Sequence, residues 1–217
     1  MDKTLKISEV CHQSGGIAVV VGPDKTRLVI SYDMASRYHL QEGVILTSAQ
    51  LEKLKQEADL FQCDNRAARL LAQRDHSIGE FKEKLRRLRF SSTSITVVTK
   101  KYKAKGMLDD AHFAYKAARS LLDRRPCGRA YMVAHLQKRR IDPDLAAKTA
   151  DLLLKDWQQS ELALRALQSR WPRVAQFELE VARRKAYNYL ARRGFGYEAA
   201  KAAFDQLWSG KQEEPRD

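Results

Sequence analysis

Apolar residues recur at helical spacing over most of the chain, and one stretch sets the pattern. Ser77 is followed three residues later by Glu80, the spacing of a capping box in which the serine hydroxyl and the glutamate carboxylate each accept a backbone N–H. We therefore predict a helix that starts at Ile78, with Phe81 and Leu85 on its inner face and basic residues on its other faces.

Two more short helices are expected directly after this one. The hydroxyls of Ser91–Ser94 predict the start of a helix whose inner face includes Ile95. Gly106 is expected to end it in the left-handed conformation. Asp109 and Asp110 then predict the cap of a third helix, whose buried face starts at Phe113. The resulting unit is a group of three short helices.

The N-terminal part carries the strand-like signals. Four apolar segments are expected to be strands, namely Leu5–Ile7, Ile17–Val21, Arg27–Ile30 and Val44–Leu46. Pro23 and Asp24 predict a turn that joins two of them into a hairpin. So small a sheet needs a helix on its apolar face, and the segment Ser48–Phe61 has the spacing for it.

The three-helix pattern repeats. A leucine followed after four residues by an apolar residue occurs three times, as Leu85 and Phe90, Leu136 and Ile141, and Leu190 and Phe195. The leucines are 51 and 54 residues apart. Tandem units that each bury a face on their neighbours form elongated curved arrays. We therefore predict a mainly α fold of tandem three-helix repeats in such an array, with a small N-terminal antiparallel β segment.

The chain is expected to divide into five segments. They are an N-terminal β-hairpin and helix extension at 1–62, helical repeats at 63–125, 126–171 and 172–209, and a disordered tail at 210–217. Within the repeats, Asp142 and Pro143 predict a helix start, and Pro172 is expected to open the last long helical segment. Gly194 is expected to end that segment before a final helix at Tyr197–Trp208.

Positive charge is concentrated after residue 60. The chain has a formal net charge of +13, but residues 1–60 hold seven Lys or Arg against eight Asp or Glu, a net of −1, so the remainder carries +14. A charge of this size favours a polyanionic partner, and its distribution assigns that partner to the helical repeats.

Composition points to a cytoplasmic protein. The three cysteines are far apart in the sequence and show neither a disulfide framework nor zinc-ligand spacing. The N-terminus does not read as a signal sequence, and no apolar stretch is long enough to predict a membrane span. We therefore expect no membrane partner, and a monomer.

An enzymatic function finds little support. His76 beside Asp75 could act as a general base, but no nucleophile lies in a recognisable motif, and a histidine beside a helix cap usually forms local hydrogen bonds. Asp109 and Asp110 could hold a divalent ion, although capping explains them better. No glycine-rich phosphate loop follows a strand. We predict no catalytic residue, no metal and no cofactor.

The basic residues of the repeated turns are the stronger candidates for function. They occur at the same point of each repeat and are Lys84, Arg86, Arg87, Arg89, Lys138, Arg139, Arg140, Arg192 and Arg193. Stacked repeats would align them into a stripe that can neutralise phosphates or an acidic protein surface. A helix-turn-helix interpretation of 190–204 is disfavoured, because the second helix carries only Lys201 where base-reading and phosphate-binding side chains are needed.

Taken as a set, these residues resemble the bacterial regulatory protein RecX family over roughly 64–208. The motif begins at Leu71 and includes Arg74, His76, Ser77, Glu80, Lys84, Leu85, Phe90, Gly106, Leu108, Asp109, Asp110, Phe113, Ala114, Arg119 and Ser120. Its later part includes Gly128, Leu136, Arg139, Ile141, Leu190, Arg192, Arg193, Gly194, Phe195 and Tyr197. Residues 1–60 look like the strand-bearing extension that some members have.

The resemblance implies a modulator of the RecA recombinase. It implies tandem three-helix repeats that lie along the groove of the RecA–DNA filament and suppress its ATPase, strand-exchange and coprotease activities, with consequences for DNA repair and the SOS response. Single- and double-stranded DNA are further partners that it implies for some members. The second hypothesis, from a different class, is a sequence-nonspecific DNA-binding protein that acts without RecA.

Overall fold

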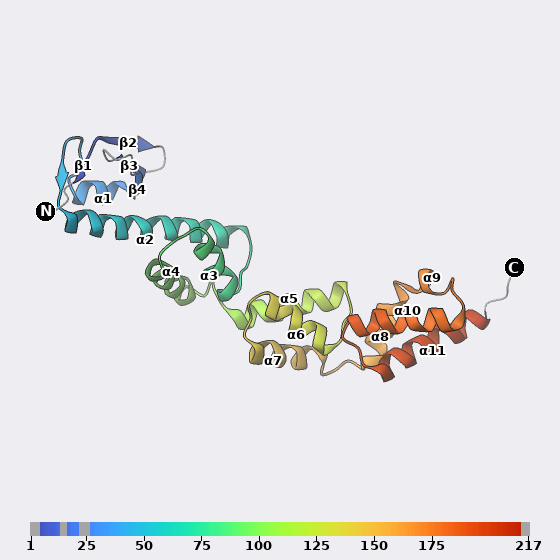
Figure 1. The fold of residues 1–217 in the computed structure, drawn as a ribbon. Helices are drawn as coiled ribbons and strands as arrows, with labels where there is room; N and C mark the ends of the chain where they lie inside the picture. The colour runs from blue at the N-terminus through green and yellow to red at the C-terminus, as the bar shows by residue number, and fades with distance from the viewer. Residues whose placement is uncertain (1–4, 14–16, 22–26, 214–217) are drawn as a thin grey trace. The chain divides into compact units, whose positions relative to one another are not determined.

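The computed structural model describes residues 5–13, 17–21 and 27–213 of the chain. These residues are mainly helical and form two compact units (Figure 1). The first unit consists of Met1–His76 and Glu80–Leu108, and the second of Ser77–Gly79 and Asp109–Asp217. A mainly α fold with a small N-terminal antiparallel β segment is therefore confirmed.

The strands of the first unit form two small antiparallel sheets. The larger sheet has the order β2 (Glu9–Gln13), β3 (Ile17–Val21) and β4 (Arg27–Ser31), and the smaller pairs β1 (Leu5–Lys6) with β5 (Ile45–Leu46). The expected hairpin is confirmed, since β3 pairs with β4 in a register that places Ala18 opposite Ile30. Its predicted turn at Pro23 and Asp24 lies outside the described residues.

The sequence pattern does not predict two elements of this unit. Strand β2 has few apolar residues, and its pairing with the next strand, β3, along its whole length stabilises it; the apolar pattern of β2 itself does not contain that contribution. Helix α1 (Tyr32–Arg37) follows β4 directly, and the Ser31 hydroxyl caps it by accepting the Met34 N–H at 3.2 Å.

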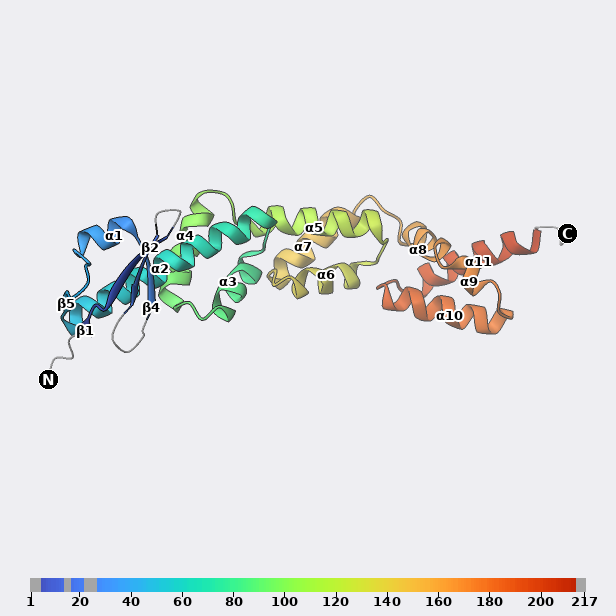
Figure 2. The same ribbon diagram turned by 90° about the horizontal axis from the view of Figure 1, so that it is seen from above.

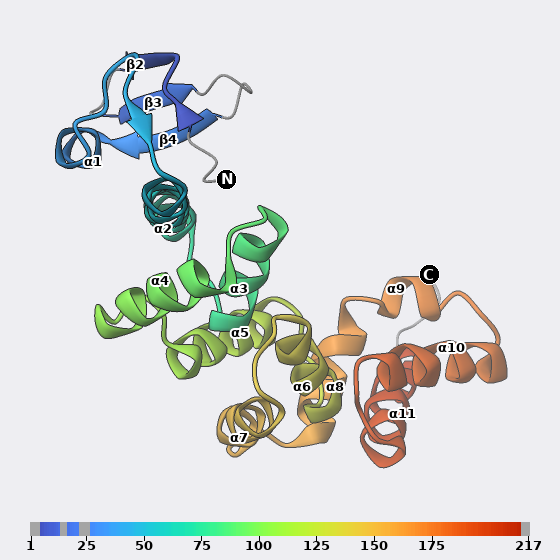
Figure 3. The same cartoon turned by 60° about the vertical axis from the view of Figure 1, so that its left-hand side comes forward.

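Helix α2 (Ser48–Gln73) covers the larger sheet (Figure 3). Leu54 and Ala58 on α2 are buried in one core with Val20 and Ile30 of the sheet, as the sequence predicts. A capping box at Thr47 and Gln50 starts the helix. It then runs without a break past residue 62, so the expected boundary between extension and first repeat falls inside one helix.

Helices α3 (Ile78–Arg87) and α4 (Ser92–Ala104) follow α2. The Ser91 hydroxyl caps α4 by accepting the Ser94 N–H, and Gly106 has a φ of +68° after the helix end, both as predicted. Phe81 of α3 meets Tyr102 of α4 edge to face, with 6.3 Å between ring centroids.

The second unit contains two groups of helices (Figure 2). One group is α5 (Asp110–Arg124), α6 (Arg129–Lys138) and α7 (Pro143–Leu154). The other is α8 (Gln159–Gln168), the short α9 (Trp171–Val174), α10 (Leu179–Arg192) and α11 (Tyr197–Glu213). Their inner faces share one core that includes Leu136, Leu162, Leu190 and Phe204, none of them more than 1% exposed.

Each of the two helical groups begins one helix earlier in the chain than the corresponding predicted repeat. Helix α5 packs on α6 and α7, and α8 packs on α10 and α11, so the boundaries at 126 and 172 each cut through a group. Pro172 lies in the four-residue helix α9, and the long helix α10 starts at Leu179. A proline permits a helix start but does not set the length of that helix, which depends here on packing.

The expected disordered tail is partly wrong. Helix α11 continues through Gly210 to Glu213, and only 214–217 lie outside the described residues. Tertiary contacts hold this last turn, because the Lys211 ammonium lies 4.5 Å from the centroid of the Trp208 ring and donates to the Ala175 carbonyl.

The cysteines provide a test of the packing in both units. Cys63 and Cys127 are buried, and burial raises the pKa of their thiols to about 12 and about 11. Cys11 is half-exposed, and its hydrogen bond to Glu9 also raises the pKa of its thiol, so its faster reaction depends on exposure. The thiolate is the reactive form, so at pH 8 we expect a disulfide reagent to modify Cys11 at least tenfold faster than the other two. In urea all three should react at similar rates. Fast native modification of Cys127 would contradict the packing.

Candidate binding surface

The three repeated turns each have a left-handed residue at the same position. Arg89, Arg140 and Gly194 occupy the same place in the repeat and have φ angles of +65°, +62° and +80°. Two of the turns are closed by a backbone hydrogen bond. In the second turn the Ile141 N–H donates to the Leu136 carbonyl, and in the third turn the Phe195 N–H donates to the Leu190 carbonyl. A left-handed arginine costs about 1–2 kcal/mol relative to the right-handed conformation, so two arginines here are unusual.

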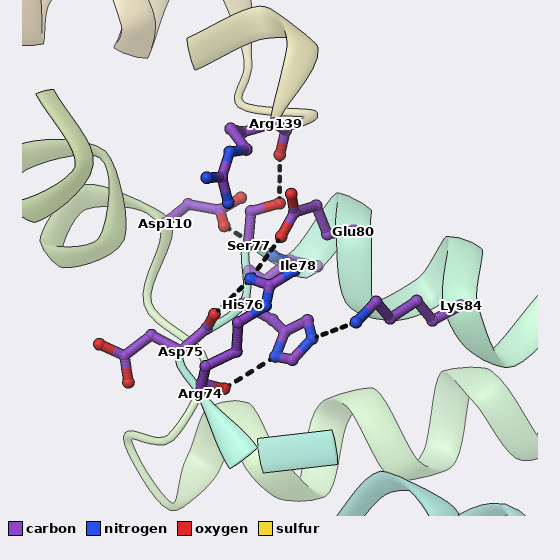
Figure 4. Close-up of polar contacts among 9 residues, drawn as sticks. All are labelled: Arg74, Asp75, His76, Ser77, Ile78, Glu80, Lys84, Asp110 and Arg139. Carbon is purple, nitrogen blue, oxygen red and sulfur yellow. Dashed lines mark hydrogen bonds and ion pairs between the residues drawn. The ribbon is translucent and has the colours of Figure 1, made fainter. Parts of the chain in front are cut away.

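The turn after α6 contacts the segment that opens α3 (Figure 4). The Ser77 hydroxyl donates to the Arg139 carbonyl at 2.5 Å, and the Ile78 N–H donates to the Asp110 carboxylate at 2.7 Å. A Cβ on Gly79 would lie 2.4 Å from the Cβ of Arg140, so only glycine fits there. Asp110 thus binds the start of another helix, while Asp109 caps α5 as predicted.

The turn after α10 contacts the start of α6 in the same way. The Gly128 N–H donates to the Arg193 carbonyl at 2.9 Å, and a Cβ on Gly128 would lie 2.0 Å from the Gly194 oxygen. A Cβ on Gly194 would in turn lie 2.6 Å from the Tyr131 nitrogen. Backbone approaches backbone here, and both glycines are required for it.

Arg193 has an internal role in this contact. Its guanidinium donates to the Pro126 carbonyl at 2.7 Å and lies 5.0 Å from the centroid of the Tyr131 ring. Only 9% of the residue is exposed. We therefore assign Arg193 to the joint between the two helical groups, although the sequence places it among the binding residues.

The remaining predicted cations differ in their surroundings. Arg86 and Arg87 are exposed, and both pair with Glu83. Arg89, Lys138, Arg140 and Arg192 are exposed, and Arg139 is half-buried. The cluster from Lys84 to Arg89 belongs to the first unit and the other two to the second.

Buried His76 and half-buried Lys84 form a polar pair in the first unit (Figure 4). The His76 ring is linked through Nδ1 to the Arg74 carbonyl at 2.8 Å and through Nε2 to the Lys84 ammonium at 2.9 Å. A carbonyl only accepts and an ammonium only donates, so the imidazole is neutral with its proton on Nδ1. The Arg74 guanidinium pairs with Glu80 at 3.1 Å. These family-motif residues hold the α2–α3 connection.

The surroundings of His76 keep its imidazole neutral. Burial lowers the pKa of its imidazole, and the nearby positive charges of Arg74 and Lys84 lower it further. Burial also lowers the pKa of the Lys84 ammonium. With Nε2 occupied by Lys84, the imidazole has no free lone pair for a general base, which argues against the catalytic hypothesis for His76.

Further basic residues, outside the predicted clusters, line two hollows of the second unit. They lie at the end of α5 and on or beside α8, α9 and α10, and are Arg124, Arg125, Arg165, Arg170, Arg173 and Lys185. A signal existed in the sequence, because residues 165–193 hold eight Lys or Arg against two Glu. The spacing of these residues in the sequence is irregular, so only the folded helices show which of their side chains share a hollow.

Metal and membrane sites find no support among the described residues. In the ranges 5–13, 17–21 and 27–213, no group of three or more His, Cys, Asp or Glu is arranged to hold a metal ion. No helix in those ranges is both long and apolar enough to cross a membrane.

Comparison with known sequences gives consistent matches. The family domain described as "RecX, third three-helix domain" matches residues 158–204, the segment of α8 to α11. The Regulatory protein RecX of Pelodictyon phaeoclathratiforme is 31% identical over 141 residues, 65% of this chain and 86% of that protein. The Regulatory protein RecX of Syntrophotalea carbinolica is 34% identical over 134 residues, 59% of this chain and 85% of that protein.

Two solved structures share the fold. A crystal structure of regulatory protein RecX aligns with a TM-score of 0.65 at 16% identity and covers 93% of this chain and 99% of that chain. The crystal structure of RecX from Lactobacillus salivarius aligns with a TM-score of 0.59 at 21% identity, over 70% of this chain and 97% of that one. The wider coverage of the first means that most of the strand-bearing N-terminal segment has a structural counterpart.

Protonation of His76 should destabilise the fold. Its pKa is lower in the folded than in the unfolded chain, so its contribution is present above the unfolded value of about 6.5 and is lost as the pH falls through the folded pKa. We expect wild type to lose stability relative to His76→Gln between pH 7.5 and 5, by at most about 1.4 kcal/mol per pH unit. Urea unfolding followed by circular dichroism measures this. A stability difference that is constant with pH would contradict it.

Gly194→Ala should destabilise the second unit. The new Cβ would lie 2.6 Å from the Tyr131 nitrogen at a φ of +80°, and the left-handed backbone alone costs about 1–2 kcal/mol. All three tryptophans, Trp157, Trp171 and Trp208, lie in this unit, so urea unfolding by tryptophan fluorescence reports on it.

Gly196→Ala is the matched control for that variant. A Cβ there meets nothing within 4 Å, so we expect a change within about 0.5 kcal/mol. Equal stability of the two variants would show that the close contact at Gly194 is absent in solution.

Proposed function

The chain belongs to the RecX family of regulatory proteins, and from this premise we propose that it regulates the RecA recombinase. It acts without catalysis of its own. It binds the RecA–DNA filament along the filament groove and inhibits the recombinase, ATPase and coprotease activities of RecA. DNA repair and the SOS response are the processes it affects.

The observation that carries the proposal is the repeated basic turn. Arg89 and Arg140 retain a left-handed backbone in which glycine would cost less, at a position that the repeat makes regular. Strained residues of this kind are concentrated at functional sites. Basic side chains at the same point of each repeat suit a helical polyanion, whose phosphates recur at a regular interval.

The binding residues of the proposal are the predicted cations that the structure leaves exposed. They are Arg86, Arg87, Arg89, Lys138, Arg140 and Arg192. Lys84 and Arg193 act within the protein, through His76 and Pro126 respectively. Arg86 and Arg87 share one carboxylate, so the first cluster retains net positive charge.

The second candidate function is sequence-nonspecific DNA binding without RecA. The basic residues around α8 to α10 favour it, because they add positive charge that the repeated turns do not include. The two functions differ in stoichiometry. A filament modulator inhibits RecA ATPase well below one copy per RecA monomer, whereas a competitor for DNA inhibits only after it has covered the DNA.

The test is a set of charge reversals in two clusters. Arg86→Glu, Arg87→Glu and Lys138→Glu together should raise the concentration for half-inhibition of RecA ATPase by at least tenfold, because they remove and invert three exposed charges. The measurement adds the protein substoichiometrically to preformed RecA filaments on single-stranded DNA at two salt concentrations. Circular dichroism confirms that the variant is folded.

The matched control reverses three exposed lysines outside the clusters. Lys53→Glu, Lys55→Glu and Lys148→Glu make the same change in net charge, so we expect inhibition close to that of wild type. Unchanged inhibition by the cluster variant would refute the assigned residues. Equal loss in both variants would show that bulk charge acts, and not the turns.

A further inference from the structure

A pocket opens in the first unit between α1, α2 and α4. Its volume is about 380 Å³, within the range of about 300–1,000 Å³ that is typical of small-molecule sites. Its lining residues run from Ser31 to Lys101, so all of them belong to this unit. None of them belongs to the repeated basic turns, and the pocket is therefore separate from the surface considered so far.

The middle of the pocket is apolar and a carboxylate lies toward each end. Helix α2 contributes Glu57, Leu60, Phe61 and Asp64, and this spacing places the four side chains on one face of the helix. Leu60 and Phe61 are half-buried and lie between the two acidic residues on that face. Seven residues of α-helix separate the acidic residues by about 10 Å along the helix axis.

Each of these carboxylates has one bound oxygen and one oxygen without a donor. Glu57 Oε1 accepts the Tyr38 hydroxyl at 2.9 Å, and Asp64 Oδ2 accepts the Lys101 ammonium at 2.5 Å. The other oxygens, Glu57 Oε2 and Asp64 Oδ1, are buried and have no hydrogen-bond partner among the described residues. The Arg37 guanidinium is 3.5 Å from Glu57 Oε2, which is too far for a good hydrogen bond. A ligand that donates to both oxygens would remove this deficit.

Both carboxylates can turn toward the pocket. The side chain of Glu57 is 27% exposed and that of Asp64 is 30% exposed. The terminal torsion of a glutamate or aspartate is broad, so a rotation can present the free oxygen to a ligand. Asp33 pairs with Arg37, so three carboxylates surround two cations here, Arg37 and Lys101, in a chain whose net charge is +13. A charged donor forms the stronger hydrogen bond with a carboxylate, which favours a cationic ligand.

We propose that this pocket binds a linear aliphatic diamine, with one ammonium group on Glu57 and the other on Asp64. The methylene chain between them lies on Leu60 and Phe61. Three bonds of an extended chain span about 3.3–3.6 Å, so about nine bonds join two nitrogens that lie about 10 Å apart. 1,8-Diaminooctane has this length. The site uses none of the cations assigned to the regulation of RecA, so the two proposals can fail independently.

The test titrates 1,8-diaminooctane into the full chain at low salt and follows the methyl NMR resonances. Binding should shift the methyl groups of Met34, Val97 and Val98, which line the apolar middle. Octylamine has one ammonium group fewer and putrescine is too short to reach both ends. Each should bind at least about tenfold more weakly, because each loses one hydrogen bond to a charged group. No shift of these methyl groups at millimolar diamine would overturn the proposal.

Spermidine and Mg²⁺ separate the apolar middle from a response to charge alone. Spermidine has the same length as 1,8-diaminooctane but carries a third ammonium group near its centre. It should bind more weakly, because that group would lose water over the apolar floor. Mg²⁺ keeps most of its water shell and should not displace the diamine at equal concentration. Tighter binding of spermidine, or displacement by Mg²⁺, would overturn the assignment.

Three variants test the two ends and the middle of the site. Glu57→Gln and Asp64→Asn each remove one charged end, so each should lower the affinity for 1,8-diaminooctane to about that for octylamine. Val97 is 47% exposed, so Val97→Trp can fill the pocket without a change in charge and should abolish binding. Circular dichroism confirms that each variant is folded.

Glu52→Gln is the matched control. It removes the same charge from an exposed position on the same helix, and it should leave the affinity within about threefold of wild type. Equal loss in Glu52→Gln would show that bulk charge acts and would overturn the proposal. An unchanged preference for the diamine over octylamine in both Glu57→Gln and Asp64→Asn would overturn it as well.

Discussion

Close backbone contact between turns and helix starts is the constraint on which the second unit depends. At Gly128 and Gly194 two segments of the chain approach so closely that a single methyl group on either glycine would overlap the other segment. The hydrogen bond from Gly128 to Arg193 and the buried guanidinium of Arg193 then satisfy polar groups that this approach removes from water. The segment Ser77–Gly79 meets the turn at Arg139 and Arg140 by the same means.

This mode of packing divides the cations of the turns into two kinds. A residue whose backbone lies at the contact, such as Arg193, turns its side chain inward and stabilises the joint. Its neighbour Arg192 is exposed and lines a hollow beside α9 and α10. The third turn therefore uses Arg193 in its own packing and presents Arg192 to solvent, so basic composition alone overstates the charge available for binding.

Much of the fold follows from the sequence because its signals are local. The caps at Ser91, Asp109 and Asp142 and the left-handed Gly106 depend on residues within one helical turn, and all lie where the pattern predicts them. Strand β2 and the assignment of α8 to the last group do not follow. Strand β2 is stabilised by backbone pairing with the adjacent strand β3, and α8 by packing on α10 and α11, and the apolar pattern of neither segment contains information about its partner.

The sequence by itself determined the helical class, the three equivalent turns at Arg89, Arg140 and Gly194, and the excess of positive charge after residue 60, because periodicity, capping and composition are properties of the chain alone. Only the tertiary structure decided which cations are paired, which are buried and which share a hollow. Arg183 and Lys185 are two residues apart and both positively charged, yet one pairs with Glu180 and the other lines a hollow beside Phe177. A charge acts through its neighbours in space, and packing alone sets those neighbours.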